Sequence, residues 1–96
     1  MSTFVPTDRP QLLPRARLQI DKVTGRPMLL YPEGVLFLNP TGHAIVTLCT
    51  KEYTFDKIIT TLSDQFNVSP DVLTAEVTTY LNQLRAKNLI GVVQPE

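Results

Sequence analysis

The sequence is short of the residues that build catalytic and metal sites. Its 96 residues include one cysteine, one histidine, four glycines and no tryptophan. A single cysteine excludes an internal disulfide. One histidine and one cysteine also fall short of the four ligands of a structural zinc site. The glycines are scattered, so there is no glycine-rich phosphate-binding loop. These shortages argue against an enzyme and a metalloprotein, and we expect no cofactor and no metal.

The chain also lacks net charge and long apolar runs. Nine basic and nine acidic residues give a formal net charge of zero, so no overall field attracts nucleic acid or an anionic membrane. No apolar run approaches the roughly 20 residues that span a bilayer. The first residues lack the basic start and apolar stretch of a signal peptide, and we expect a cytoplasmic location. A hydrophobic content of 43% is that of a folded domain.

Few side chains remain as candidates for chemistry. His43 is a candidate general base, but a lone histidine in a first helical turn is more often a surface or capping residue. Cys49 lies on an apolar helical face, where cysteine usually behaves as a small buried hydrophobe. The carboxylates at Asp56, Asp64, Asp71 and Glu76 fall on helix faces that we expect to be solvated. The residues therefore predict no catalytic site.

The first part of the chain predicts an extended arm followed by a sheet. Residues 1–15 contain three of the eight prolines, which disfavours a helix. We expect Leu12 and Leu13 to pack and residues 1–8 to be loose. From residue 16 apolar and polar residues alternate, as in a half-buried strand. Residues 28–31 and 35–38 predict two further strands, with turns at Thr24-Gly25 and at residues 32–34. The three strands form an antiparallel meander.

The second part predicts three helices. Asn39, Thr54 and Ser69 are N-cap residues, and two of them precede a proline, which is favoured at the first helical position. The expected helices span about residues 40–50, 55–66 and 70–87. The middle helix has an apolar stripe at helical spacing, formed by Phe55, Ile58, Ile59, Leu62 and Phe66. Residues 90–93 either add a short strand or cover the core.

This order predicts an α+β, winged-helix-like fold in which a three-stranded antiparallel sheet precedes a three-helix bundle. Residues 16–93 form the single domain and residues 1–15 the arm. A DNA-binding winged helix is the alternative function for this fold. It needs a basic recognition helix, and the second helix offers only Lys57 beside Asp56 and Asp64. We therefore expect no nucleic-acid partner.

The chain resembles the PqqD family, the peptide chaperones of pyrroloquinoline quinone biosynthesis and founding examples of the RiPP recognition element. The matching pieces are Arg9-Pro10, LPRARL at residues 13–18, Asp21, LLYPEGVLFLNPTGHAI at residues 29–45 and LRAKNLIGV at residues 84–92. Gly42-His43 departs from the small helix-forming residues, such as alanine, that we expect there. This departure loosens the first helical turn without removing the binding surface.

The resemblance implies a non-catalytic adaptor. Family members bind the precursor peptide PqqA and present it to the radical SAM enzyme PqqE, which cross-links a Glu and a Tyr of the peptide. The peptide adds as a strand beside the third strand and packs against the third helix, which is β-augmentation. An exposed edge strand also allows a homodimer, through that edge or a swapped arm.

The implied peptide-binding residues lie on these two elements, and the sequence leaves some of their roles open. Either Leu36 and Leu38 or Val35 and Phe37 point into the core. On the helix, Tyr80 is the better contact candidate, whereas Leu73, Val77 and Leu84 suit the core better. Arg85 either pairs with an acidic group of the peptide or bonds the carbonyls at the helix end. The full set is Val35, Leu36, Phe37, Leu38, Val77, Tyr80, Leu81, Leu84 and Arg85.

Overall fold

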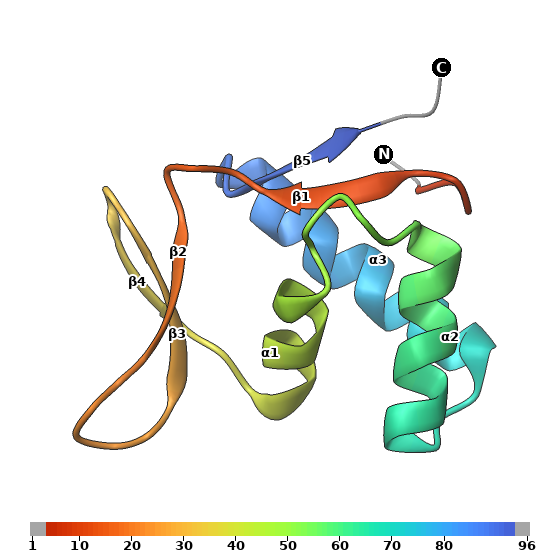
Figure 1. Ribbon diagram of the computed structural model, residues 1–96, viewed down its shortest axis with the longest axis horizontal. Helices are drawn as coiled ribbons and strands as arrows, with labels where there is room; N and C mark the ends of the chain where they lie inside the picture. The colour runs from red at the N-terminus through yellow and green to blue at the C-terminus, as the bar shows by residue number, and fades with distance from the viewer. Residues whose placement is uncertain (1–3, 94–96) are drawn as a thin grey trace.

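Two small antiparallel sheets and three helices make up the computed structural model, which describes residues 4–93 (Figure 1). The elements follow the chain as β1 (Arg9–Leu12), β2 (Arg17–Ile20), β3 (Pro27–Tyr31), β4 (Gly34–Phe37), α1 (Pro40–Thr47), α2 (Phe55–Phe66), α3 (Pro70–Ala86) and β5 (Ile90–Val93). The expected α+β class, with a three-stranded antiparallel sheet followed by three helices, is confirmed. None of the helices within the described residues is long and apolar enough to cross a membrane.

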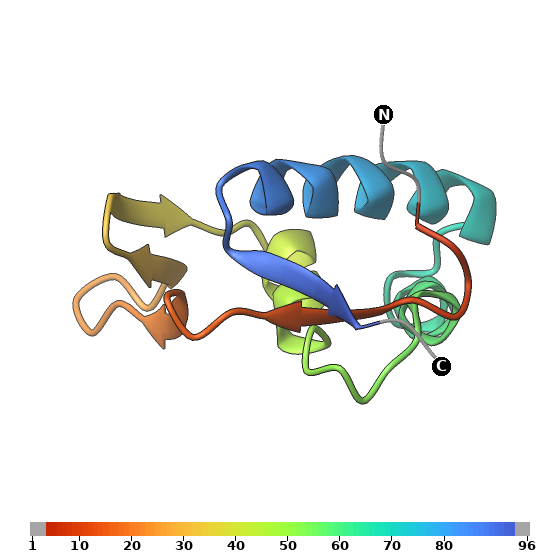
Figure 2. The same ribbon diagram turned by 90° about the horizontal axis from the view of Figure 1, so that it is seen from above.

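The three-stranded sheet has the order β2-β3-β4 and projects from one side of the helices (Figures 1 and 2). Both expected turns connect its strands. In the first turn Gly25 has a φ of 73°, and the Asp21 N–H donates to the Arg26 carbonyl at 2.8 Å. In the second turn Gly34 has a φ of 154°, a conformation that residues with a side chain rarely adopt. The meander is therefore set by local turn chemistry.

Each of the three helices begins at the N-cap residue that the sequence predicts. The backbone N–H groups of Gly42, Lys57 and Val72 donate to the side chains of the capping residues Asn39, Thr54 and Ser69. Such a cap satisfies one of the amides that the first turn leaves without an intrahelical partner. α2 then buries the first four residues of its predicted stripe, Phe55, Ile58, Ile59 and Leu62.

α1 ends at Thr47, three residues before the expected end at Thr50. The backbone just beyond the helix bonds to β1 instead: the Leu12 N–H donates to the Cys49 carbonyl at 2.9 Å, and Gln11 forms a bridge with Thr50. Because the Cys49 carbonyl accepts from β1, it does not accept the bond that a continuing helix would give it, and α1 ends before this point.

The start and the end of the described chain pair with each other. β1 and β5 are antiparallel, with Arg9 opposite Val93 and Leu12 opposite Ile90. Figure 2 shows this two-stranded sheet lying alongside α3. Residues 90–93 therefore form a strand, one of the two options that the sequence left open.

The expectation that residues 1–8 are loose is wrong for the part of this segment that is described. The Phe4 ring is 5% exposed and stacks on Phe55 with a centroid separation of 5.5 Å. Asp8 is 4% exposed, and its carboxylate accepts the Val5 N–H at 3.0 Å. The free energy gained by burying an aromatic ring exceeds the conformational entropy lost when the chain end becomes ordered. Residues 1–3 lie outside the described residues. The division into an arm of residues 1–15 and a domain of residues 16–93 stays a prediction.

Candidate functional site

β4 is an outer strand of its sheet, because β3 is its only neighbour within residues 4–93. The register places Leu36 opposite Leu29 and Phe37 opposite Met28. One step further along, the Leu38 N–H donates to the Pro27 carbonyl at 3.0 Å. Hydrogen-bonded and non-hydrogen-bonded pairs alternate along an antiparallel ladder. Leu36 and Leu38 therefore bond inward to β3, whereas the N–H and C=O groups of Val35 and Phe37 point to the open edge.

The side chains of β4 divide in the same way, and this settles which pair faces the core. Leu38 is 4% exposed and Leu36 is half-buried, whereas Val35 and Phe37 are each 48% exposed on the opposite face. The guanidinium of Arg26 lies over the Phe37 ring, 4.6 Å from its centroid. Phe37 thus contributes both an open backbone edge and an exposed apolar surface.

On α3, the aliphatic residues of the expected site belong to the core. Val77 and Leu81 are 0% exposed and Leu84 is 1% exposed. They hold the helix in place, but they leave a ligand almost no side-chain surface. That these three residues contact a peptide stays a prediction, and the sequence already favoured the core for Val77 and Leu84.

Arg85 lies on another side of α3. Its guanidinium carbon is 5.2 Å from the centroid of the Phe4 ring, so this charge stacks on the buried N-terminal aromatic residue. The five positions between Arg85 and Tyr80 correspond to about 140° around a helix. The structure therefore brings Tyr80, but not Arg85, to the side of α3 that carries the depression described next. Pairing of Arg85 with an acidic group of a peptide stays a prediction.

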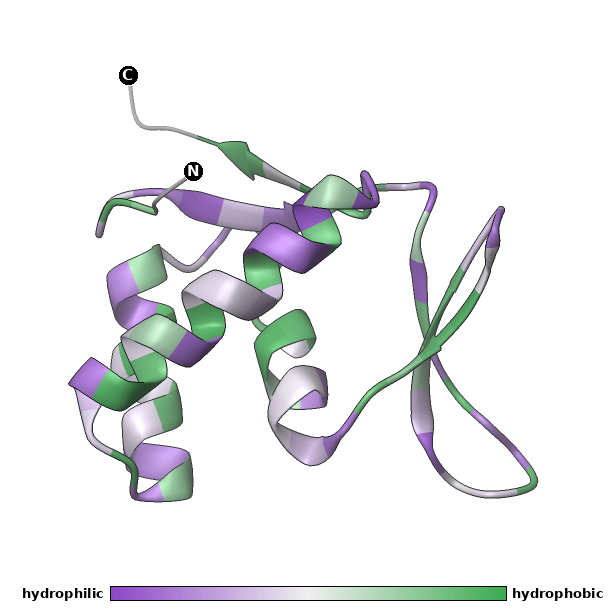
Figure 3. Cartoon of the chain, turned by 180° about the vertical axis from the view of Figure 1, so that it is seen from behind, coloured by the Kyte–Doolittle hydropathy of each residue, from purple (hydrophilic) through white to green (hydrophobic). Residues whose placement is uncertain are grey.

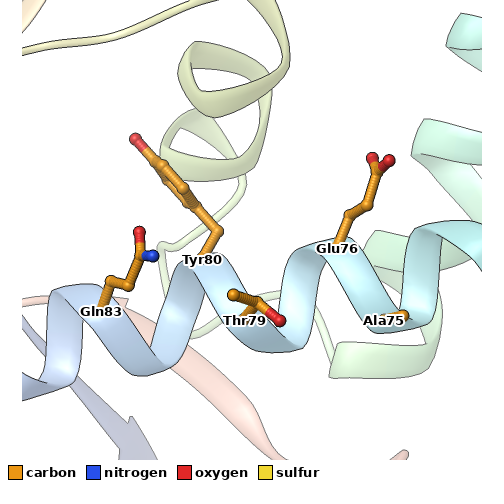
Figure 4. Close-up of a pocket in the computed structure, with 5 residues that line it drawn as sticks. All are labelled: Ala75, Glu76, Thr79, Tyr80 and Gln83. Carbon is orange, nitrogen blue, oxygen red and sulfur yellow. The ribbon is translucent and has the colours of Figure 1, made fainter.

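The accessible surface of α3 near β4 is formed by one stripe of residues. Of this stripe, the sequence had predicted only Tyr80 as a peptide contact. A shallow depression is lined by Ala75, Glu76, Thr79, Tyr80 and Gln83. Figure 4 shows Glu76, Tyr80 and Gln83 pointing to the same side of the helix, with Tyr80 directed toward α1. Adding Lys87 gives positions i, i+4, i+7 and i+11, which share one helical face. We call Glu76, Tyr80, Gln83 and Lys87 the α3 stripe.

The residues that flank β4 lie near two residues of the α3 stripe, Lys87 at the start of the strand and Tyr80 after its end. Just before β4, Glu33 lines a second depression together with Tyr31, Lys87 and Asn88. Just after β4, the first turn of α1 contacts Tyr80, as described below. β4 therefore runs alongside the C-terminal half of α3 in the opposite direction. Figure 3, seen from behind, shows α3 crossing in front of α2, with α1 between α3 and the three-stranded sheet and with much of β3 and β4 hydrophobic.

Tyr80 packs against Gly42 so closely that no larger residue fits without a shift. A Cβ atom at Gly42 would lie 2.7 Å from the Tyr80 hydroxyl oxygen and 2.9 Å from the ring carbon that carries it. The glycine in the first turn of α1 thus makes room for the tyrosine. Burial, with a smaller contribution from the Cys49 thiol, raises the pKa of Tyr80, so its hydroxyl is neutral at physiological pH. An apolar ring with a neutral polar tip is a common contact for peptides.

An ion pair joins two of the sequence segments that carry the family resemblance. The Arg15 guanidinium donates to both carboxylate oxygens of Glu33 at 2.9 Å. Arg15 belongs to LPRARL and Glu33 to the turn before β4. It is the one salt bridge recorded within the described part of the chain. Because its side chains are 37% and 63% exposed, it orients the turn more than it stabilises the fold.

Neither of the two residues weighed for chemistry lines the depression on α3. His43 lines a depression with Gln65 and Phe66, on the α2 side of α1. Cys49 is 2% exposed, its thiol donates to the Ile45 carbonyl at 3.3 Å, and burial raises its pKa to about 12. Such a thiol is neutral and unreactive at physiological pH. Within residues 4–93, no group of three potential metal-ligating side chains comes together.

Two relatives of known name are similar to this chain in sequence. The chain is 35% identical over 65 residues to the PqqA binding protein of Methylococcus capsulatus, covering 65% of this chain and 70% of that protein. It is 27% identical over 78 residues to the PqqA binding protein of Rhizobium meliloti, covering 81% and 80%. These alignments cover more than two thirds of each relative.

A solved structure extends the match to the fold. It is the solution NMR structure of the PqqD truncation of Methylobacterium extorquens PqqCD, described as a functional, stand-alone RiPP recognition element. The TM-score is 0.77 at 26% identity, over 93% of this chain and 95% of that one. A sequence model of the family "Coenzyme PQQ synthesis protein D (PqqD)" matches residues 28–90, which include four of the five residues of β3, all of β4 and all three helices. The chain therefore belongs to the PqqD family.

Proposed function

We propose that this protein is a non-catalytic peptide chaperone of pyrroloquinoline quinone biosynthesis. It binds the precursor peptide PqqA by strand addition to β4 and presents it to the radical SAM enzyme PqqE. The observation that carries the proposal is the open edge of β4, where the backbone groups of Val35 and Phe37 have no partner strand among the described residues. Family membership and the relatives named as PqqA binding proteins support it.

Strand addition gives binding that depends little on side chains. The N–H and C=O of two residues on β4 can each bond to an extended peptide, which makes up to four main-chain hydrogen bonds. The Tyr80 ring and the half-buried Leu36 offer apolar surface to peptide side chains that point toward the helices. Specificity then comes from the groups on α3, and much of the affinity from the edge.

The geometry also suits presentation. A peptide added to β4 lies at the margin of the protein, and every second side chain points to the exposed outer face beside Val35 and Phe37. A modifying enzyme can reach those side chains without displacing the peptide. The chaperone itself needs no catalytic group or cofactor for this task. The same edge is open to a second copy of the chain, and a homodimer stays a prediction. The cytoplasmic location is a separate prediction.

Binding of labelled PqqA, followed by fluorescence anisotropy, tests the first part of the proposal. We expect saturable binding by the intact chain and much weaker binding by Phe37→Pro, because proline has no N–H to donate at the open edge. Cross-linking of PqqA by PqqE should be faster with the intact chain than with Phe37→Pro. No binding of PqqA, together with a DNA mobility shift that weakens steeply with salt, would instead favour the DNA-binding regulator.

A further inference from the structure

Unpaired charges of opposite sign lie at the two ends of the α3 stripe. Glu76 lines the first depression, where it is the only acidic or basic side chain. Lys87 lines the second depression with Arg15 and Glu33, which neutralise each other through their two hydrogen bonds. Neither Glu76 nor Lys87 forms a salt bridge within residues 4–93. The α3 stripe is thus negative at one end and positive at the other.

Helix electrostatics explains only one of these charges. Lys87 is the C-cap of α3, where a cation suits the negative end of the helix dipole. Glu76 lies seven positions into a helix that starts at Pro70, beyond the first turn in which an acid interacts well with the dipole. Tyr80 and Gln83 separate the two charges along the stripe, so neither charge neutralises the other.

On this basis, and resting on the proposed function, we infer that the α3 stripe selects, among peptides added to β4, an extended segment in which a basic residue is followed, toward the C-terminus, by an acidic residue. The basic side chain pairs with Glu76 and the acidic side chain with Lys87. Side chains between them that face the helix pack on Tyr80 and Gln83.

The distance between Glu76 and Lys87 along the helix sets the spacing of the two charged residues in the peptide. Eleven positions of an α-helix span about 16 Å, which corresponds to about five residues of an extended strand. Only alternate residues of a strand face the helix, so the two charged residues are about four or six positions apart. Odd spacings send one of the charges to the outer face of the sheet.

The direction of β4 sets the order. β4 starts near Lys87 and ends near Tyr80, as its flanking residues show. An antiparallel strand, which pairs slightly better than a parallel one, runs the other way, from the Glu76 end toward the Lys87 end. The basic residue of the bound segment therefore precedes the acidic one.

Two labelled synthetic peptides test this inference by fluorescence anisotropy. Both have the same Val/Thr-rich composition and the same net charge. One has Lys six positions before Glu, and the other has the two residues exchanged. The intact chain should bind the Lys-first peptide about fivefold to tenfold more tightly at low ionic strength, since each exposed ion pair contributes little alone. The preference should shrink with added salt because of screening.

A charge-exchanged chain keeps the test independent of folding. Glu76→Lys combined with Lys87→Glu should reverse the preference to the Glu-first peptide. Lys57→Glu combined with Asp64→Lys makes the same exchange on exposed positions of α2 and should leave it unchanged.

The outcomes separate this inference from the proposed function. Equal affinity for the two peptides, with binding of both lost in Phe37→Pro, overturns the charge selection and leaves strand addition intact. Failure of both peptides to bind while PqqA binds normally overturns the charge selection as well. If PqqA and both peptides fail to bind, the proposed function itself is wrong.

Discussion

Proline substitutions at neighbouring positions of β4 should have opposite consequences. Phe37→Pro removes an N–H that points to the open edge, and Leu36→Pro removes one that bonds inward to Leu29. We therefore expect Phe37→Pro to fold and to lose peptide binding. Leu36→Pro should instead damage the fold, because proline is tolerated on the free side of an edge strand but not within a ladder.

The magnitudes differ enough to be measured. A peptide carbonyl left without its donor at Phe37→Pro costs about 2 kcal/mol of binding free energy, roughly a 30-fold rise in Kd. The proline ring also occupies the space of the missing N–H, so the full loss is larger. Leu36→Pro should lower the free energy of unfolding by about 2–3 kcal/mol, because it leaves the Leu29 carbonyl without its donor. That is a large share of the roughly 5–15 kcal/mol expected for a domain of this size.

Urea unfolding and PqqA titration on the same samples separate the two effects. Phe37→Ala is the matched control, because it removes the same ring and keeps the N–H. It should bind PqqA more tightly than Phe37→Pro. Equal Kd values for intact protein, Phe37→Ala and Phe37→Pro would refute strand addition at this edge. A folded Leu36→Pro variant of normal stability would refute the assigned hydrogen-bond pattern.

Three further predictions concern packing and ionisation. Gly42→Ala pushes the Tyr80 ring from its place and should weaken PqqA binding by about 1 kcal/mol; in a double-mutant cycle with Tyr80→Ala, purely additive effects would contradict the contact. The pKa of Cys49 is raised by burial from 9.0 to about 12, so the unfolded chain loses this proton first as the pH rises. The free energy of unfolding should therefore fall between pH 9 and pH 12, by up to ~1.4 kcal/mol per pH unit. Urea titrations should show a shallower fall for Cys49→Ala, and identical profiles would speak against a buried neutral thiol. Phe4→Ala removes a ring stacked on Phe55 and should cost about 3 kcal/mol of stability in urea, whereas a negligible change would favour a loose arm.

Local chemistry made the three-stranded meander and the three helices predictable from the sequence. The caps at Asn39, Thr54 and Ser69 depend on side chains within a few residues of the amides that they bind. The turn glycines Gly25 and Gly34 likewise act on their own backbone. Such signals can be read within a few residues of sequence, and for this reason the boundaries of these elements needed little correction.

The pairing of β1 with β5 was not predictable in this way. Arg9 and Val93 lie at opposite ends of the described chain, and no local pattern specifies such a partner. The early end of α1 follows from the same long-range pairing, because β1 also binds the backbone at Cys49. Burial of Phe4 has the same origin, since its stacking partner Phe55 begins α2.

The candidate site was predictable by element but not by residue. Choosing apolar residues on α3 selected Val77, Leu81 and Leu84, which are the residues that the core buries. Helical spacing does identify the accessible face. Tyr80, Gln83 and Lys87 lie four, seven and eleven positions after Glu76, and residues at this spacing share one face of a helix. The inward or outward direction of each β4 amide depends on the register with β3, which only the structure provides.

An NMR titration of isotope-labelled protein with synthetic PqqA tests whether the peptide is captured between β4 and α3. We expect shift changes concentrated in Gly34–Phe37 of β4 and along the α3 stripe. The amides of Val35 and Phe37 should move more than that of Leu36, because only they can gain a hydrogen bond to the peptide. Shifts confined to other elements, or no shifts at a large excess of peptide, would contradict peptide capture between β4 and α3.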